Sequence, residues 1–158
     1  MDEDYKIITI DSSYVNYKTS NLYDFYMNLD EPLRNVYKIN VITILVDVPL
    51  SSSNVFSPLD PIYVNINDYN RLISKKDNNN LYYFDSLIVE NIISSRITIK
   101  NDYNTSDNIY YLNPLEPQLK RFNVRLLDKD NLLINKSNIN RIIIKLGVYY
   151  NNKKDTRV

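Results

Sequence analysis

The sequence contains neither cysteine nor histidine, and these two absences remove most of the common chemistry of protein sites. Without cysteine there is no disulfide, no thiolate nucleophile and no thiolate metal ligand. Without histidine the chain lacks the commonest metal ligand and the commonest general base. Only carboxylates, lysine and tyrosine remain for catalysis, and we expect no catalytic residue, no metal site and no cofactor.

Glycine is almost absent as well, since Gly147 is the only one in 158 residues. This scarcity excludes the glycine-rich loops that cradle phosphates, including the P-loop and the GxGxxG turn. An all-β chain normally uses glycine where a turn needs a positive φ, so asparagine, with 24 copies, is expected to fill such positions. The 20 isoleucines and 15 tyrosines favour strands.

The charges balance, because 19 basic and 19 acidic side chains give a formal net charge of zero. This balance argues against a large electrostatic footprint for nucleic acid or an anionic membrane. The first residues are acidic and lack the apolar region of a secretory signal. No apolar run reaches the roughly 18 residues of a spanning helix, so we expect no direct membrane insertion.

Alternation of apolar and polar residues predicts strands along most of the chain. The expected strands cover residues 5–10, 23–29, 36–48, 62–66, 81–90, 96–100, 109–112, 119–126 and 141–150. Residues 36–48 are the longest hydrophobic stretch, and within it residues 41–46 are apolar on both faces, which is typical of a central strand covered on both sides. A turn is expected at Asp30-Glu31-Pro32. Polar loops are expected at 11–21, 50–60, 75–80 and 101–108, and one or two helical turns at 68–74.

About eight to ten strands joined by loops indicate an antiparallel sandwich or barrel. We therefore predict an all-β, antiparallel two-sheet sandwich, a single jelly roll, over residues 1–150. Residues 151–158 form a polar C-terminal tail, which is expected to be either disordered or an arm on a partner.

The clearest pattern lies in residues 111–134. Arg121 and Arg125 alternate with Phe122 and Val124, which predicts a strand with one polar and one apolar face. Residues 128–131 then read Asp-Lys-Asp-Asn and resemble the start of a calcium loop. Such a loop needs glycine at its sixth position and glutamate at its twelfth, which here are leucine and isoleucine, so we interpret the segment as a hairpin turn.

The tyrosines allow three interpretations. They can pack across strands at the edge of the core. They can also lie at subunit contacts, where tyrosine is enriched. In a third interpretation they form stacking platforms for sugars or single-stranded nucleic acid.

The order of several segments resembles a recurrent pattern in jelly-roll minor capsid and penton proteins of nucleocytoplasmic large DNA viruses. The matching segments are Asp11-Ser12-Ser13, residues 23–29, Pro32-Leu33-Arg34-Asn35-Val36, residues 64–69, residues 117–126, residues 128–131 and residues 142–148. The resemblance spans roughly residues 11–148, and no single segment is specific by itself. Asn131 stands where the pattern has glycine, and asparagine adopts the same left-handed geometry.

The resemblance implies a non-enzymatic capsid protein, either the penton at five-fold vertices or another minor capsid component. It implies a homopentamer that contacts neighbouring capsid proteins, binds no nucleic acid, is assembled in the host cytoplasm and resides in the virion. Within this hypothesis the candidate subunit contacts are Arg121, Arg125, Tyr149 and Tyr150. The main alternative is a carbohydrate- or ligand-binding β-sandwich with tyrosines on a concave sheet. A hydrolase using carboxylates is a third hypothesis, although no pair of acids sits in a recognisable setting.

Overall fold

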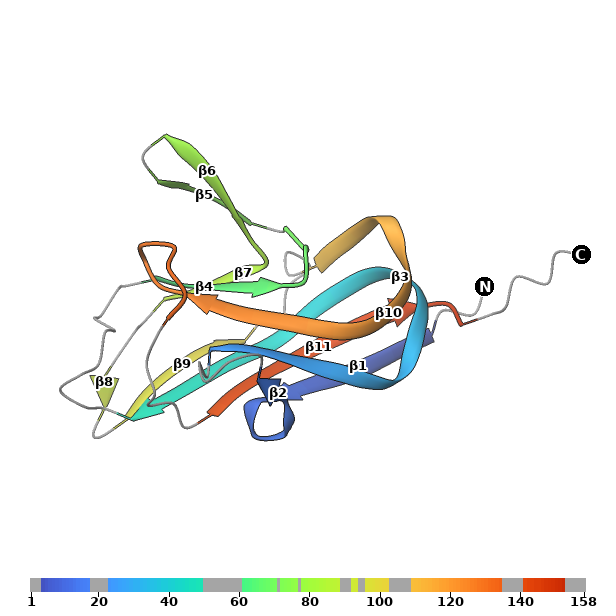
Figure 1. Ribbon diagram of the computed structural model, residues 1–158, viewed down its shortest axis with the longest axis horizontal. Coiled ribbons are helices and arrows are strands. Elements are labelled where there is room, and N and C mark those ends of the chain that lie inside the picture. Colours follow the sequence, from blue (N-terminus) through green and yellow to red (C-terminus); the bar gives the residue numbers. More distant parts are fainter. Residues whose placement is uncertain are drawn as a thin grey trace, which may run out of the picture.

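The computed structural model describes residues 4–17, 23–49, 61–70, 72–76, 78–88, 92–93, 96–102, 109–134 and 141–152 (Figure 1). The expected loop at 50–60 and most of the one at 101–108 lie outside these residues. The strands are β1 (Asp4–Asp11), β2 (Asn16–Tyr17), β3 (Asp24–Pro49), β4 (Pro61–Ile66), β5 (Leu72–Lys76), β6 (Asn79–Tyr83), β7 (Asp85–Ile88), β8 (Ile92–Ile93), β9 (Arg96–Asp102), β10 (Ile109–Leu127) and β11 (Arg141–Tyr150). A short 3₁₀ turn, η1 (Ser12–Tyr14), follows β1. The predicted all-β, antiparallel class is confirmed.

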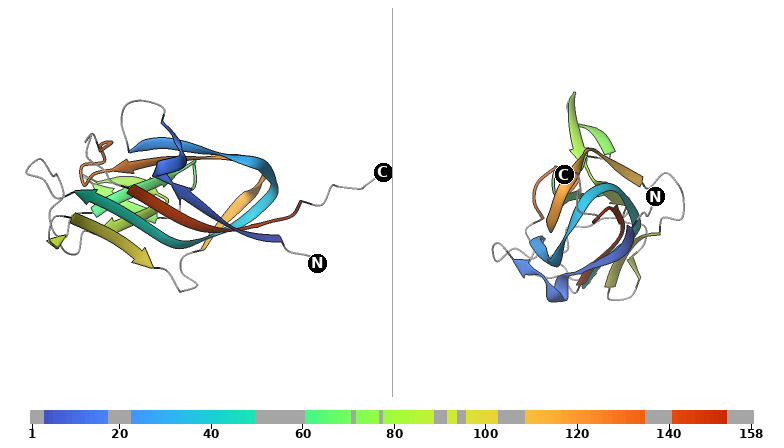
Figure 2. Two further views of the ribbon diagram at one scale, coloured as in Figure 1. Left: turned by 90° about the horizontal axis from the view of Figure 1, so that it is seen from below. Right: turned by 90° about the vertical axis from the view of Figure 1, so that its right-hand side faces the viewer.

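Nine strands belong to one sheet with the order β1-β11-β3-β10-β4-β7. β2 and β9 also pair with β3, and β8 pairs with β9. β5 and β6 form a separate hairpin that projects from the body of the molecule (Figure 1). The end-on view in Figure 2 shows that the main sheet curls over, so that its two halves face each other.

The curling follows from the lengths of β3 and β10, which span 26 and 19 residues and bend together. Between the pairs Tyr111–Lys38 and Glu116–Val36, β10 advances five positions while β3 advances two, so the excess residues lie on β10. Over residues 28–33 the excess lies on β3, opposite residues 119–121 of β10. These opposite bulges cancel, so the same register holds at both ends of the ladder. Bulges of this kind let a paired ribbon turn sharply without losing its pairing.

A single core fills the space that the curled sheet encloses. β11 alternates as predicted, with Ile142, Ile144, Leu146 and Val148 buried. Phe122, Val124 and Leu126 of β10 belong to the same cluster. Burying apolar side chains from both halves of the sheet is the main source of stability for such an architecture.

The apolar run of residues 36–48 is central in the sheet but is not covered on both faces. A register shift between Lys145 and Leu146 of β11 makes Ile42 of β3 the extra residue of a β-bulge. Because of this residue, Val41 and Ile44 both face the core although they are three positions apart. The side chains on the outer face are half-buried, so the prediction of complete covering is wrong.

Two other predicted features were wrong at the bends. Asp30-Glu31-Pro32 is not a turn between strands but part of the β3 bulge, where proline costs no ladder hydrogen bond. The predicted strands at 109–112 and 119–126 are one strand, β10, that continues through its own bulge.

The region between β4 and β7 was also predicted incorrectly. Residues 72–76 and 79–83 pair as the β5–β6 hairpin, where helical turns and a polar loop were predicted. The predicted strand at 81–90 breaks at Phe84, whose buried ring lies at a bend and whose N–H bonds to the carbonyl of Val64 at 3.0 Å. The expected loop at 11–21 contains η1 and β2, and its residues 18–21 lie outside the described chain.

Asparagine does replace glycine at strained backbone positions, as predicted. The described residues with positive φ are Asn35, Asn67, Asn78 and Asn131, and Gly147 is not among them. Asn67 adds side-chain bonds, because its Oδ1 accepts from the N–H of Asn123 at 2.8 Å. A left-handed backbone costs asparagine less conformational free energy than most other residues, because its side chain forms hydrogen bonds with nearby backbone groups.

Asn67 allows the backbone and side-chain contributions to be separated. Asn67→Gly keeps the positive φ but removes the side-chain bonds, whereas Asn67→Ala removes the bonds and strains the backbone. We expect the alanine variant to have a free energy of unfolding lower than that of the glycine variant by about 1–2 kcal/mol in urea titrations. Asn65→Ala, two residues earlier on β4 and without a positive φ, is the control. Equal losses in the two Asn67 variants would contradict the interpretation.

Candidate functional site

The two arginines predicted to contact a neighbour lie on the outer face of β10. Arg121 donates from Nε to Oδ1 of Asn28 at 2.8 Å, and its guanidinium lies 4.4 Å from the ring centre of Tyr26. Arg125 is exposed and faces Asp24 across the ladder with β3. Arg121 is therefore engaged within its own chain, which makes Arg125 the stronger candidate for a contact with another molecule.

The two predicted tyrosines point to opposite sides of β11. Tyr150 faces the core and is 8% exposed. Tyr149 lies on the outer face, where its ring centre is 4.7 Å from that of Tyr5 and 4.0 Å from Nζ of Lys38. These three residues form a cross-strand row over β1, β11 and β3. The four predicted contact residues thus do not form one patch, because Tyr150 is interior.

The only glycine of the chain makes space for this row. A Cβ atom at Gly147 would lie 2.6 Å from Oη and 2.8 Å from Cε2 of Tyr5. Since the φ of Gly147 is not positive, the position requires a missing side chain and not a special backbone. The ring of Tyr5 therefore reaches Tyr149 by crossing over the bare backbone of β11.

Substituting this glycine should give effects of opposite sign in two backgrounds. In the wild type, Gly147→Ala displaces Tyr5 and lowers the melting temperature, since an aromatic pair contributes about 0.5–1.5 kcal/mol. In a Tyr5→Ala background the same substitution should stabilise the strand by about 0.5–1 kcal/mol, because glycine is the poorer strand residue. Thermal unfolding of all four proteins checks this, and an equal effect in both backgrounds would refute the steric explanation.

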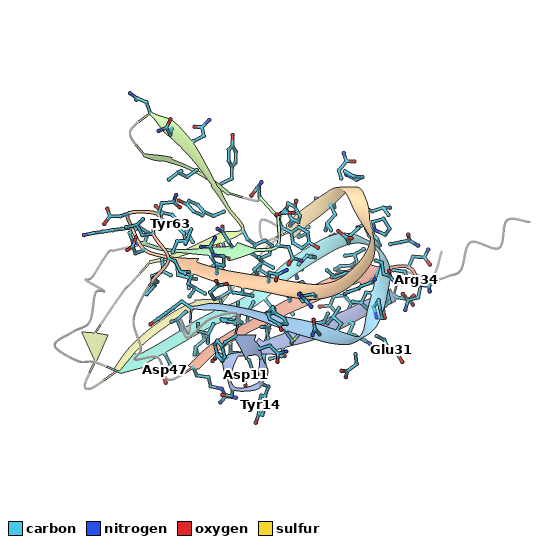
Figure 3. The ribbon with its side chains drawn as sticks, in the orientation of Figure 1. Asp11, Tyr14, Glu31, Arg34, Asp47 and Tyr63 are labelled. Carbon is cyan, nitrogen blue, oxygen red and sulfur yellow. The ribbon has the colours of Figure 1, made fainter. Side chains whose placement is uncertain are left out.

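The Asp-Ser element at residues 11–13 forms a corner that closes the β1–β11 ladder. Oδ1 of Asp11 accepts from the N–H of Ser13 at 3.0 Å and from Nε of Arg141 at 3.1 Å. The buried Oγ of Ser12 accepts from the N–H of Ile142 at 2.8 Å. A side chain thereby satisfies a strand donor where the main-chain pairing ends. Figure 3 shows Tyr14 beside this corner, and its side chain is 83% exposed.

The ion pair at this corner predicts a pH-dependent stability. The hydrogen bond from Arg141, helped by the N–H of Ser13, holds the pKa of Asp11 below its ordinary value of 3.8, against the opposing effect of burial. A carboxylate with a lowered folded pKa contributes stability above its unfolded pKa, and this contribution is lost as the pH falls through the folded value.

We therefore expect Asp11→Asn to lower the urea midpoint at pH 6–7, and we expect this loss to shrink as the pH falls below the unfolded pKa of Asp11 and to disappear below its folded pKa. Arg141→Gln should reproduce this pH dependence, whereas Arg125→Gln, on an unrelated strand, should leave it unchanged. A difference between wild type and Asp11→Asn that stays constant from pH 7 to pH 3 would exclude the ion pair as its cause.

One groove, of about 550 Å³, lies where β4 ends against β10, and we call it the Asn67 groove. Its polar lining includes Asn67, Asp68, Tyr69, Glu116, Lys120 and Arg121. The ring of Tyr69 stacks on Tyr110 at 5.3 Å, and burial raises the pKa of Tyr69 to about 12. Acidic and basic groups are balanced along this wall, so the groove suits a neutral polar ligand better than a strongly charged one.

A second groove, of about 380 Å³, lies between β1 and the bend of β3, and we call it the β1 groove. It is lined by Lys6, Ile8, Leu29, Asp30, Glu31 and Leu33. The aliphatic side chains make an apolar floor, and the acidic residues stand at its rim. Figure 3 shows Glu31 together with Arg34 at the bend of β3.

The exposed tyrosines are spread over several elements of the fold. Among the described residues, the tyrosines with more than a third of their surface accessible are Tyr5, Tyr14, Tyr17, Tyr82 and Tyr111. They lie on β1, η1, β2, β6 and β10, which are different elements. Other tyrosines pack on each other, such as Tyr63 and Tyr83 with ring centres 4.0 Å apart. Cross-strand packing therefore accounts for several tyrosines.

Comparison with known proteins does not assign the chain to a group. No protein-family model matches it, and no curated protein matches its sequence significantly. Within the described ranges, no three acidic side chains converge closely enough to hold a metal ion. The part of the chain that the structure describes also has no helix with the length and apolar character needed to cross a membrane.

The sequence predicted the outer face of β10, named Asp11-Ser12-Ser13 only as part of a loop and of the resemblance, and indicated neither groove. Each groove joins segments that are far apart in the chain, such as Lys6 with Glu31 in the β1 groove. The asparagine after an alternating strand, Asn67, was a usable signal for the other groove, because a positive φ there redirects the chain toward β10.

Proposed function

We propose that the chain is a non-enzymatic structural protein of a large DNA virus capsid, built on a single jelly roll. Its place is the penton at the five-fold vertices, or another minor capsid position. It assembles as a homopentamer in the host cytoplasm and contacts neighbouring capsid proteins in the virion. The sequence resemblance supports the family, and the strand pairing supports the fold.

The observation that carries this proposal is the pairing scheme. In an eight-stranded jelly roll the first strand pairs with the eighth, the second with the seventh, the third with the sixth and the fourth with the fifth. If the two arms of the bent β3 count as the second and third strands, this scheme corresponds to β1–β11, β3–β10, β3–β9 and β4–β7. The pairs β11–β3 and β10–β4 would join these into two layers of four strands.

The surface offers features that suit assembly through protein contacts. Arg125 stands on the outer face of β10, and Tyr14 protrudes from η1. The β5–β6 hairpin projects beyond the sheet and carries the exposed Tyr82 (Figure 1). Arginine and tyrosine are enriched at protein interfaces, where they supply much of the binding energy. A closed ring of copies would use such surfaces in a heterologous, head-to-tail manner.

The alternative function, a carbohydrate- or ligand-binding module, is favoured by one observation, the polar Asn67 groove. Its volume of about 550 Å³ falls in the range of small-molecule sites. The scattered exposed tyrosines provide no stacking platform there. Selective binding on a glycan array that is lost in Lys120→Ala and retained in Lys129→Ala would favour this function over a capsid role.

The capsid proposal predicts a defined particle mass. Mass photometry should detect a species of five times the chain mass of 18.7 kDa, and the chain should be present in purified virions. Arg125→Glu should raise the concentration needed for half-assembly by about tenfold or more, since it places like charges in a contact. Lys129→Glu, in the exposed turn after β10, should assemble normally.

Unchanged assembly of Arg125→Glu would remove that residue from the interface. A monomer at every concentration, together with absence from purified virions, would overturn the proposed function itself.

A further inference from the structure

β1 is an edge of the sheet with a groove beside it. Within the described residues, β1 pairs with β11 alone. The β1 groove has a floor that includes the nearly buried Ile8 and Leu33, while Asp30 and Glu31 are exposed at its rim. A strand edge next to an apolar groove is the geometry that binds an extended peptide by strand addition.

The C-terminal segment begins at the same place. Oδ1 of Asn152 accepts from the N–H of Arg34 at 2.9 Å, and its own N–H donates to Oδ2 of Asp4 at 3.4 Å. The carbonyl of Asn151 accepts from Nδ2 of Asn35 at 3.1 Å. These bonds connect the start of the segment to β1 and to the bend of β3, which are the two walls of the β1 groove.

The residues that follow have a composition that fits the groove. Residues 153–158 read Lys-Lys-Asp-Thr-Arg-Val, with three basic side chains, one acidic side chain and one apolar side chain. The groove lining has two acidic side chains, Asp30 and Glu31, against one basic side chain, Lys6, so its charge is opposite to that of the segment. The valine suits the apolar floor. Opposite charges of this kind set the register and the partner of a bound strand.

We propose that residues 153–158 of one copy bind as an extended strand in the β1 groove of a neighbouring copy. The occupant is a second copy because of strand direction. β11 runs antiparallel to β1, so the chain passes Asp4 while it moves away from Lys6 and Ile8. To enter its own groove it would have to reverse direction just after Asn151 and Asn152, which are already bonded to Arg34, Asn35 and Asp4. A segment from a neighbour enters without such a reversal.

The inference rests on the proposed function only in requiring that copies of the chain meet. A labelled peptide of residues 151–158 should bind a chain that lacks residues 153–158, as measured by fluorescence anisotropy. The double variant Asp30→Lys/Glu31→Lys should weaken this binding by about tenfold or more through loss of both rim charges. The matched control is Asp68→Lys/Glu116→Lys in the Asn67 groove, which should bind the peptide normally.

Exchange between copies is tested by mixing two proteins. The first is the chain without residues 153–158, which has an intact β1 groove. The second is the full-length Asp30→Lys/Glu31→Lys variant, which has an intact C-terminal segment. Native mass spectrometry should find mixed complexes of these two proteins, and neither alone should form linked copies through the segment. Failure of the peptide to bind, or equal binding by both double variants, would overturn the inference. So would peptide binding without any mixed complex, since the segment would then fold back on its own chain.

The outcomes separate this inference from the proposed function. Pentamers that form equally well in the truncated chain, without peptide binding, would refute segment exchange and leave the capsid proposal intact. Dimers linked by the segment, with no pentamer at any concentration, would support segment exchange and refute the penton proposal.

Discussion

The main-chain pairing of β3 with β10 is the interaction on which the rest of the sheet depends. β3 also pairs with β2, β9 and β11, while β10 also pairs with β4, so four of the other seven strands of the main sheet pair directly with one of these two. The remaining strands, β1, β7 and β8, pair with β11, β4 and β9 in turn. Because both strands continue through the bend, the two halves of the sheet share covalent chain and a hydrogen-bonded ladder. Separating the halves would expose paired backbone groups as well as apolar side chains, which makes the unit cooperative.

The sequence predicted the parts of the fold that depend on local alternation. β1, β4 and β11 lie where period-two patterns placed them, and the turn after β10 forms as expected, with Asp128 Oδ1 accepting from the N–H of Leu132. The bends were missed because proline is a turn signal in isolation, whereas Pro32 lies in a bulge that is specified by its partner strand. The β5–β6 hairpin was missed because its polar strands resemble a loop in composition.

For the candidate site as well, the sequence could predict which side chains face outward but not which residues of distant strands they contact. Alternation placed Arg121 and Arg125 outside, and the same rule extended along β11 would have placed Tyr149 outside and Tyr150 inside. The engagement of Arg121 by Asn28 depends on the register between β3 and β10, which no local pattern encodes. Both grooves depend in the same way on how distant segments meet at the bends.

The use of asparagine at positive φ has a consequence for the chemical lifetime of the chain. Asparagine deamidates when the next backbone nitrogen attacks its side chain, and this reaction is fastest when glycine follows. The residues after the four left-handed asparagines are Val36, Asp68, Asn79 and Leu132, and the single glycine follows Leu146. The chain thus obtains glycine-like backbone geometry from a thermolabile residue type without containing one Asn-Gly pair. None of these four left-handed positions therefore has the neighbour that most accelerates the loss of an asparagine side chain.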